Sequence, residues 1–319
     1  MEKRRPKSAV PRDDDSSANE LNDNDPKGTA GEPPERTLTA TPPPRLPLLW
    51  EMPVPSNWAA IDFISDLHLS SAAPKTFEAF AQHLQHTSAD AVFILGDLFE
   101  LWVGDDARDG AFEAQCVEVL TEASSRRTLA FMQGNRDFLL GSRMLKTCGV
   151  MALPDPTVLL AYGERLLLTH GDALCLADRP YQTFRSMVRS EAWQQSFLSK
   201  PLSERRALGA RMRCESESFK AKQNKQASAE WTDIDTACAV RWMHEAGTPS
   251  LIHGHTHRPA TEGLAPGYTR WVLSDWDMDS PGETPRAEVL RWQQSGLTRR
   301  PPTTANSSTT QASASSAAT

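Results

Sequence analysis

Five short motifs in this chain hold side chains that can bind metal ions. They are Ser65-Asp66-Leu67-His68, Gly96-Asp97, Gly134-Asn135-Arg136-Asp137, Thr169-His170-Gly171-Asp172 and Gly254-His255-Thr256-His257. Their oxygen and imidazole donors suit divalent Mn, Fe, Zn or Co and bind soft metals poorly. Seven such donors are too many for one ion. The pattern therefore predicts a centre for two divalent ions, with the candidate ligands Asp66, His68, Asp97, Asn135, His170, His255 and His257.

The charge of these donors indicates the class of substrate. In a two-ion centre one carboxylate bridges ions that lie about 3.5–4 Å apart. Asp97 follows Gly96, which permits a tight turn, so we expect Asp97 to be the bridge. Only Asp66 and Asp97 bring formal negative charge, while two divalent ions bring four positive charges. The centre would keep a net charge near +2, which favours an anionic phosphate.

Each motif alone also has an ordinary structural interpretation. An Asp-x-His triplet is frequent in surface loops, Gly-Asp is a common turn, and His170 could be a hydrogen-bonded histidine of the core. His255 and His257, two residues apart on a strand, would share one face, which is moderately specific. All five motifs in this order, each after an apolar segment, favour one shared metal centre.

The segments before the motifs have the composition of strands. Apolar runs at 59–65, 91–95 and 128–132 alternate with helix-length segments at 76–86, 110–125 and 138–148. This alternation is typical of a largely parallel sheet, whose carboxyl edge is where ligands bind. Closely spaced runs at 157–162 and 165–169 predict a second, more antiparallel sheet. A helical insertion is expected over about 178–247, and strands return at 251–252, 268–274 and 287–292.

The two ends of the chain differ in composition from this folded body. Residues 1–56 hold eleven of the 23 prolines and little apolar periodicity, and residues 299–319 are mainly Ser, Thr and Ala. Such segments bury too little apolar surface to offset their ordering entropy. We therefore expect disordered tails at 1–56 and 299–319, around a folded body over 57–298.

Composition also excludes several classes of protein. The net charge of −7 argues against binding nucleic acid through bulk positive charge. The five cysteines form no C-x-x-C pair, which argues against a disulfide framework or a thiolate zinc site and favours a reducing compartment. The basic N-terminus leads into Pro11-Arg12-Asp13 rather than an apolar stretch, so no secretion signal is expected. Apolar runs also fall short of the ~20 residues that a membrane span needs.

The order D-x-H, G-D, G-N-R-D, H-G-D, G-H-T-H resembles that of the calcineurin-like metallophosphoesterases. The resemblance covers about residues 59–295 and implies a two-sheet α/β/β/α sandwich with two metal ions at its strand ends. Longer strings resemble the members that cleave UDP-2,3-diacylglucosamine in lipid A biosynthesis: Phe63–Leu69, Gly96–Asp106, Gly134–Phe138, His170–Cys175, Tyr181–Arg185 and Ile252–Pro259. The activity this implies is hydrolysis of the diphosphate to UMP and 2,3-diacylglucosamine 1-phosphate, by metal-activated water attacking the uridyl phosphorus.

The resemblance also implies roles for individual residues. Mn²⁺ is the usual metal of the family. One ion would be held by Asp66, His68, Asp97 and His257, and the other by Asp97, Asn135, His170 and His255. The catalytic set would be Asp97, Asn135, Arg136 and His255, and the substrate would contact Asn135, Arg136, His255 and Asp178. In the insertion the family places a Ser, an Asn and a Lys on the substrate, and the nearest matches are Ser218, Lys222 and Lys225, with Ser216 a rival for Ser218.

The insertion carries both charge and apolar residues. From Lys200 to Lys225 the chain has eight basic residues and three glutamates. This excess of positive charge fits a solvated helix face. It also fits a cationic cap over a diphosphate that contacts an anionic membrane surface. The apolar residues from Tyr181 to Leu208 fit either a core or a recess for acyl chains. We expect a cytoplasmic enzyme, peripheral on the cytoplasmic face of the inner membrane, with no nucleic-acid or protein partner. The alternatives are a related phosphoesterase acting on a nucleotide or phosphodiester, and a non-catalytic scaffold, which would be expected to lack ligands.

Overall fold

The computed structural model describes residues 46–224 and 233–305, and the side chains of these residues except those of 216–224. Most of both expected tails therefore lies outside the described residues. The last part of the 1–56 tail departs from the expectation, because β1 (Trp50–Pro53) pairs in parallel with β6 (Thr157–Ala161). At the other end, β12 (Gly296–Arg300) extends the folded body two residues past 298.

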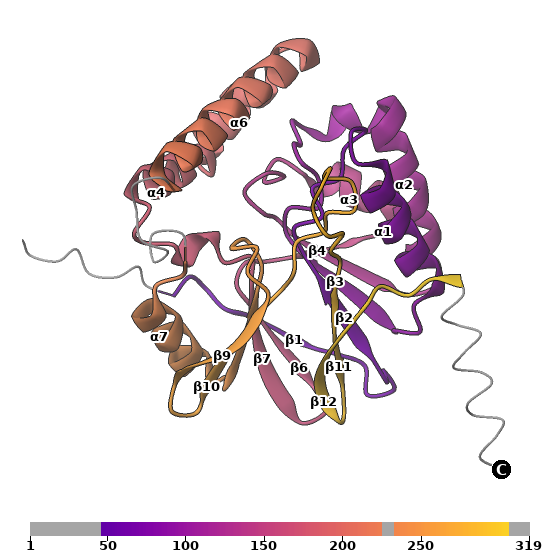
Figure 1. Ribbon diagram of the computed structural model, residues 1–319, viewed down its shortest axis with the longest axis vertical. Coiled ribbons are helices and arrows are strands. Elements are labelled where there is room, and N and C mark those ends of the chain that lie inside the picture. The colour runs from indigo at the N-terminus through magenta and orange to yellow at the C-terminus, as the bar shows by residue number, and fades with distance from the viewer. Residues whose placement is uncertain (1–45, 225–232, 306–319) are drawn as a thin grey trace, which may run out of the picture. The chain divides into compact units, whose positions relative to one another are not determined.

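One sheet has the strand order β12-β11-β2-β3-β4-β5 (Figure 1). Its central strands β2 (Ile61–Ile64), β3 (Ala91–Leu95), β4 (Thr128–Met132) and β5 (Met151–Leu153) are parallel. β11 (Val289–Gln293) is antiparallel to β2 and to β12. The buried apolar runs of β2, β3 and β4 are those of a sheet covered on both faces.

The second sheet has the order β1-β6-β7-β8-β10-β9. Its remaining strands are β7 (Glu164–Thr169), β8 (Ser250–His253), β9 (Ala260–Ala265) and β10 (Tyr268–Val272). The expectation of a more antiparallel sheet was wrong. Among the described strands, β7, β8 and β10 run parallel, and each sheet has two antiparallel pairings. The helical insertion between β7 and β8 allows this parallel crossover.

The two sheets pack face to face and helices cover their outer faces, giving the expected α/β/β/α sandwich. Alternation along β3 shows the layers: Phe93 points into the core between the sheets, whereas Ile94 packs under the helices. On this outer face lie α1 (Pro74–His86), α2 (Ala111–Ser124) and α3 (Ser142–Cys148), with the short 3₁₀ helix η1 (Asp105–Asp109) before α2. Helix α7 (Thr236–Ala246) covers the second sheet through Trp242 and Met243.

The insertion after β7 begins with a 3₁₀ turn, η2 (Asp172–Leu174), and continues as α4 (Arg179–Val188), α5 (Glu191–Leu198) and α6 (Leu202–Asn224). Figure 1 shows α4 and α6 beyond the end of the sandwich, whereas α7 lies against the sheet. The buried Arg205 of α6 anchors this insertion, because its guanidinium donates to the Val103 carbonyl and to both carboxylate oxygens of Asp106. None of the helices in the described ranges has the length and apolar character to cross a bilayer.

Candidate metal centre

The seven candidate ligands lie in loops that follow β2, β3, β4, β7 and β8, at one end of the sandwich. Five of them have a left-handed backbone: φ is 54° at Asp66, 48° at His68, 53° at Asp97, 67° at His255 and 53° at His257. This conformation is unfavourable for residues with a side chain and is concentrated at functional sites. The folded body holds these strained turns so that the side chains converge.

Two glycines allow the loops to approach each other closely. A Cβ atom on Gly134 would collide with the carboxylate of Asp97, and one on Gly254 would collide with that of Asp66. The Gly-Asn-Arg-Asp and Gly-His-Thr-His motifs thus need glycine where the backbone passes directly behind a carboxylate.

A first group of ligands comprises Asp66, His68 and His257. The Nε2 atom of His257 lies 3.4 Å from Asp66 Oδ1 and 3.2 Å from His68 Nε2. The backbone N–H of His255 donates to both oxygens of Asp66, at 3.1 and 2.9 Å, and fixes that carboxylate. Three donor atoms therefore face one point.

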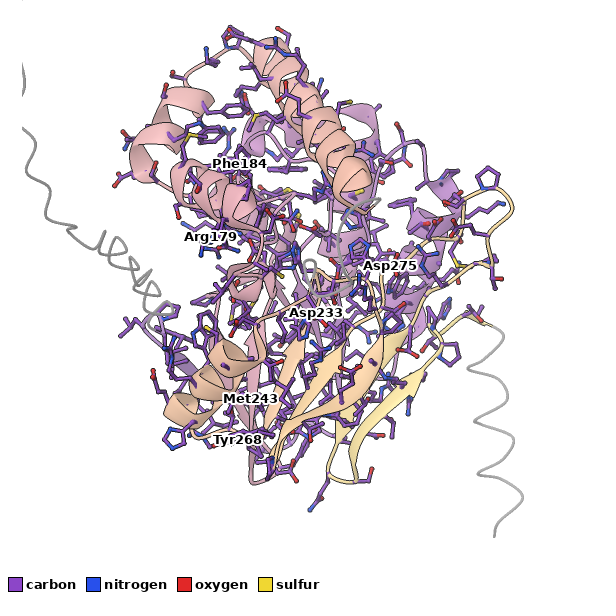
Figure 2. All side chains as sticks on the ribbon, turned by 60° about the vertical axis from the view of Figure 1, so that its left-hand side comes forward. Arg179, Phe184, Asp233, Met243, Tyr268 and Asp275 are labelled. Atoms are coloured by element: carbon purple, nitrogen blue, oxygen red, sulfur yellow. The ribbon has the colours of Figure 1, made fainter. Side chains whose placement is uncertain are left out.

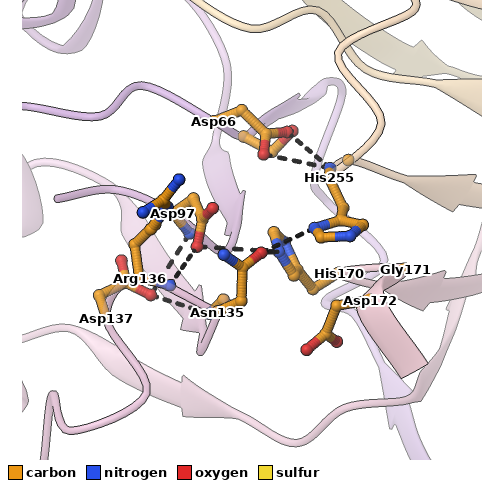
Figure 3. A network of polar contacts seen from close by, with 12 residues as sticks. Asp66, Asp97, Asn135, Arg136, Asp137, His170, Gly171, Asp172 and His255 are labelled. Atoms are coloured by element: carbon orange, nitrogen blue, oxygen red, sulfur yellow. Dashed lines mark hydrogen bonds and ion pairs between the residues drawn. The ribbon is translucent and has the colours of Figure 1, made fainter. Parts of the chain in front are cut away.

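A second group lies beside the first and is shown in Figure 3. Asn135 Oδ1 is 3.0 Å from His170 Nε2 and 2.7 Å from His255 Nδ1. The Leu95 carbonyl lies 2.8 Å from Nδ1 of His170. Because a carbonyl can only accept, this contact places the proton of neutral His170 on Nδ1 and leaves the Nε2 lone pair toward the centre.

Asp97 lies between the two groups. Its Oδ2 is 3.9 Å from His68 Nε2, and its Oδ1 is 3.7 Å from His170 Nε2. The backbone N–H of Arg136 donates to Oδ1 at 2.8 Å. This orientation directs one oxygen toward each group, which is compatible with the predicted bridging role.

The electrostatics of the centre favour bound cations. Burial lowers the pKa of His170, but the negative charge of Asp97, Asp172 and Asp66 outweighs it and raises that pKa to about 9. Burial and then the nearby Asp97 raise the pKa of Asp137 to about 7. In the absence of bound cations, the closely spaced carboxylates therefore raise the pKa values of His170 and Asp137, so these two groups tend to hold protons. Oxygen and imidazole donors in this number suit divalent metal ions, so the residues fit two of them.

Buried carboxylates that are not ligands hold the loops in place. Asp137 accepts backbone N–H groups from Leu98 (2.7 Å) and Gly134 (2.8 Å), and so ties the turn after β3 to the turn after β4. Asp172 accepts from Tyr181 Oη at 2.6 Å and from Arg185 Nε at 2.8 Å, which ties α4 to the loop of His170.

Comparison with known proteins agrees with this architecture. The calcineurin-like phosphoesterase family matches residues 59–259 of the chain. The chain belongs to this family. The matched range contains all seven candidate ligands and the strands β2, β3, β4, β7 and β8 that precede them.

Three curated relatives of this phosphoesterase are named UDP-2,3-diacylglucosamine hydrolase. The relative from Chromobacterium violaceum is 46% identical over 222 residues, which are 68% of this chain and 90% of the relative. That from Ralstonia nicotianae is 43% identical over 249 residues, 76% of this chain and 92% of the relative. That from Aromatoleum aromaticum is 42% identical over 239 residues, 73% and 93% of the two chains.

A cavity of about 340 Å³ lies between the insertion and the sandwich of this phosphoesterase. Aromatic residues of α4 and α5 line it, including Phe184 (Figure 2), Trp193 and Phe197. The opposite wall comes from the loops after β3 and β4, including Trp102 and Phe138. Such a volume and such an apolar lining are usual for small-molecule sites.

The polar end of the cavity contains several residues predicted from the sequence. Asn135, Arg136 and Asp178 all line it, so the cavity is continuous with the second ligand group. Asp178 also caps α4 by accepting the Tyr181 N–H at 2.9 Å. The side chains of Ser216, Ser218 and Lys222 lie in the part of α6 that is not described, and Lys225 lies outside the described residues.

Sequence reasoning assigned no role to two carboxylates beside the centre. Glu100 lies 3.2 Å from Nδ1 of His68, and Asp275 lies 3.6 Å from Nδ1 of His257. Burial lowers the pKa of His68, but Glu100 and the nearby aspartates outweigh it and raise it. Glu100 lies within the Gly96–Asp106 string, which was an available signal, whereas no motif surrounds Asp275.

Proposed function

We propose that this phosphoesterase hydrolyses the diphosphate bond of UDP-2,3-diacylglucosamine, giving UMP and 2,3-diacylglucosamine 1-phosphate. The observation that carries the proposal is the apolar cavity that opens on the predicted metal ligands through Asn135 and Arg136. A phosphodiester or a free nucleotide would need the ligands alone, whereas an acylated substrate also needs an apolar recess of this kind. The names of the three relatives agree with this substrate.

The centre would hold two divalent ions, with Mn²⁺ as the metal. Asp66, His68, Asp97 and His257 would hold one ion, and Asp97, Asn135, His170 and His255 the other. When bound, the two ions supply Lewis acidity to the phosphoryl oxygens and lower the pKa of water. Asp66 and Asp97 are the formal negative charges in this set, so the loaded centre would attract the anionic diphosphate.

The chain's own residues would orient the substrate. The side chain of Arg136 lies at the junction of centre and cavity, where a guanidinium can make charge-assisted, bidentate contacts to phosphate. Asn135 and His255, 2.7 Å apart, would present their polar atoms to the same phosphate, and Asp97 would hold the two ions at a fixed separation. Asp178 at the cavity mouth would contact the polar part of the substrate.

The insertion would bind the rest of the substrate and the membrane surface. Ser218, Lys222 and Lys225 would contact the substrate from α6 and the segment after it. Met187 and Leu198 on α4 and α5 are 50% and 42% exposed, which is consistent with peripheral contact between these helices and a lipid surface. This contact would place the enzyme at the cytoplasmic face of the inner membrane, where its acylated substrate would reside.

The deciding experiment compares two substrates with purified protein and Mn²⁺. We expect rapid release of UMP from UDP-2,3-diacylglucosamine and slow release from a UDP-sugar without acyl chains. Equal rates would favour the alternative, a phosphoesterase for nucleotides or phosphodiesters. No hydrolysis of either substrate by metal-loaded protein would contradict the proposed activity altogether.

A further inference from the structure

Both histidines of the first ligand group have a carboxylate behind them. His68 and His257 direct Nε2 toward the centre, because these two atoms lie only 3.2 Å apart. Their Nδ1 atoms point the other way. Glu100 Oε2 lies 3.2 Å from Nδ1 of His68, and Asp275 Oδ2 lies 3.6 Å from Nδ1 of His257.

Arginines hold both carboxylates in these positions. Arg286 binds Asp275 through Nε, at 3.0 and 2.9 Å from the two oxygens, and through Nη2 at 2.7 Å. Asp275 is only 4% exposed and lies on the segment after β10 (Figure 2). Glu100 is held by Nε of Arg213 on α6, at 2.6 Å.

The support of His170 in the second group is different. Its Nδ1 lies 2.8 Å from the Leu95 carbonyl, a neutral acceptor in the backbone. A carboxylate behind a metal-binding histidine fixes the Nδ1–H tautomer and raises the basicity of Nε2 more than a neutral carbonyl does. The two carboxylates therefore strengthen both histidine donors of the first group, and each of them contacts a histidine of that group.

We propose that Glu100 and Asp275 are positioning residues that set the metal affinity of the Asp66–His68–His257 group and leave the other group unaffected. Loss of either carboxylate then weakens the binding of one ion per chain and leaves the affinity for the second ion unchanged. Removal of such a supporting residue typically lowers metal affinity by about 10- to 100-fold. This inference rests on the proposed two-ion centre.

The test is metal stoichiometry in Glu100→Gln and Asp275→Asn. Full-length wild-type protein and variants are loaded with Mn²⁺ and dialysed against graded concentrations of a chelator. Bound Mn²⁺ is then counted, and electron paramagnetic resonance distinguishes a coupled ion pair from a single ion. We expect wild type to keep two coupled ions at chelator concentrations where each variant keeps one isolated ion.

Two matched variants control for the loss of an ion pair. Asp106→Asn removes a carboxylate that binds Arg205 of the insertion, and Glu283→Gln removes a second partner of Arg286, at 3.1 Å. Asp106 pairs with Arg205 and Glu283 pairs with Arg286, and neither arginine is a candidate ligand, so both variants should keep two ions. The conservative variants Glu100→Asp and Asp275→Glu should restore part of the lost affinity.

The possible outcomes separate this inference from the proposed function. If wild-type protein never holds two ions, the two-ion centre itself is wrong. If wild type holds two ions and both variants hold them with unchanged affinity, only the positioning role of Glu100 and Asp275 is wrong. If both ions are weakened equally in folded variants, the selectivity for one group is overturned.

Discussion

The phenol ring of Tyr181 stacks on the imidazole of His255, with 5.9 Å between ring centroids and 29° between ring planes. Tyr181 belongs to α4, which lines the cavity, whereas His255 belongs to the candidate metal centre. The hydroxyl of Tyr181 also donates to the buried Asp172 at 2.6 Å. The position of the insertion is therefore linked to the position of a candidate ligand.

This link predicts a graded effect of substitutions at Tyr181. An aromatic pair contributes about 0.5–1.5 kcal/mol beyond its burial, so Tyr181→Ala should lower kcat/KM for the diacylated substrate by about 10-fold. Tyr181→Phe keeps the stack and loses the hydrogen bond to Asp172, so its loss should be smaller. Steady-state kinetics on the two variants checks this order. Equal activity of Tyr181→Ala and wild type would show that the stack does not position His255.

Substitution of Asp97, the proposed bridging carboxylate, should have the largest effect on turnover. Asp97→Asn removes the negative charge that faces both ligand groups, and we expect turnover to fall by at least about 100-fold, beyond the effect of losing a residue that only supports a ligand. Asp106→Asn, which loses its ion pair with Arg205, should lose far less turnover than Asp97→Asn. Near wild-type turnover of Asp97→Asn with both ions bound would disprove the bridging role.

The strands that position the centre were largely predictable, and the edges of the sheets were not. β3 and β4 have the ranges expected from sequence, because each is a continuous buried apolar run. β9 contains Gly263 and is largely exposed, and β1 lies in a proline-rich segment, so neither shows the pattern of a strand. Edge strands of this kind are held by pairing with a neighbour, which local sequence does not encode.

A similar limit applies to the centre itself. The candidate ligands form recognisable motifs because each lies within a few residues of the end of a strand. Asp275 is eighteen residues from His257 and reaches it only because β10 runs beside β8. Its role depends on that pairing, so no spacing along the chain could indicate it.

Arg136 should act on the substrate and leave the metal ions in place. Hydrogen bonds to charged groups contribute about 1.5–3 kcal/mol, so Arg136→Ala should lower kcat/KM by about 10- to 100-fold. Arg136→Lys should recover only part of this, because an ammonium group cannot bind phosphate bidentately. Metal analysis of the same preparations should find wild-type content. Loss of metal from Arg136→Ala would instead assign the residue to the architecture of the centre.

The cavity should matter for the acylated substrate alone. Phe184→Ala removes an aromatic wall, and the lost binding energy should lower kcat/KM for UDP-2,3-diacylglucosamine but not for a small activated phosphodiester. Combined Lys222→Ala and Lys225→Ala substitution should show the same selectivity if those residues contact the substrate. Phe77→Ala, a partly buried aromatic of α1 outside the cavity lining, is the control. Equal losses on both substrates in folded protein would argue against an acyl site.

A buried ion pair outside these loops, on β2 and β11, should control stability in acid. Arg291 donates to both oxygens of Asp62, at 2.6 and 2.7 Å, and the two side chains are 4% and 0% exposed. Burial raises the pKa of Asp62, but the hydrogen bonds and charges of Arg291 and His83 outweigh it, so the net shift is downward. The folded state therefore favours the ionised carboxylate more than the unfolded state does.

Because that pKa is lowered, the stabilisation is fully present above the unfolded value of about 3.9 and is lost as the pH falls below it. Asp62→Asn should reduce the free energy of unfolding at neutral pH by about 3–5 kcal/mol, since it leaves the buried Arg291 without its charged partner. It should also flatten the decline of stability between about pH 5 and pH 2. Urea unfolding of metal-free protein across this range measures both effects, with Glu122→Gln as the control because it breaks an exposed ion pair with Arg126. An acid decline as steep in Asp62→Asn as in wild type would mean that other carboxylates control acid unfolding.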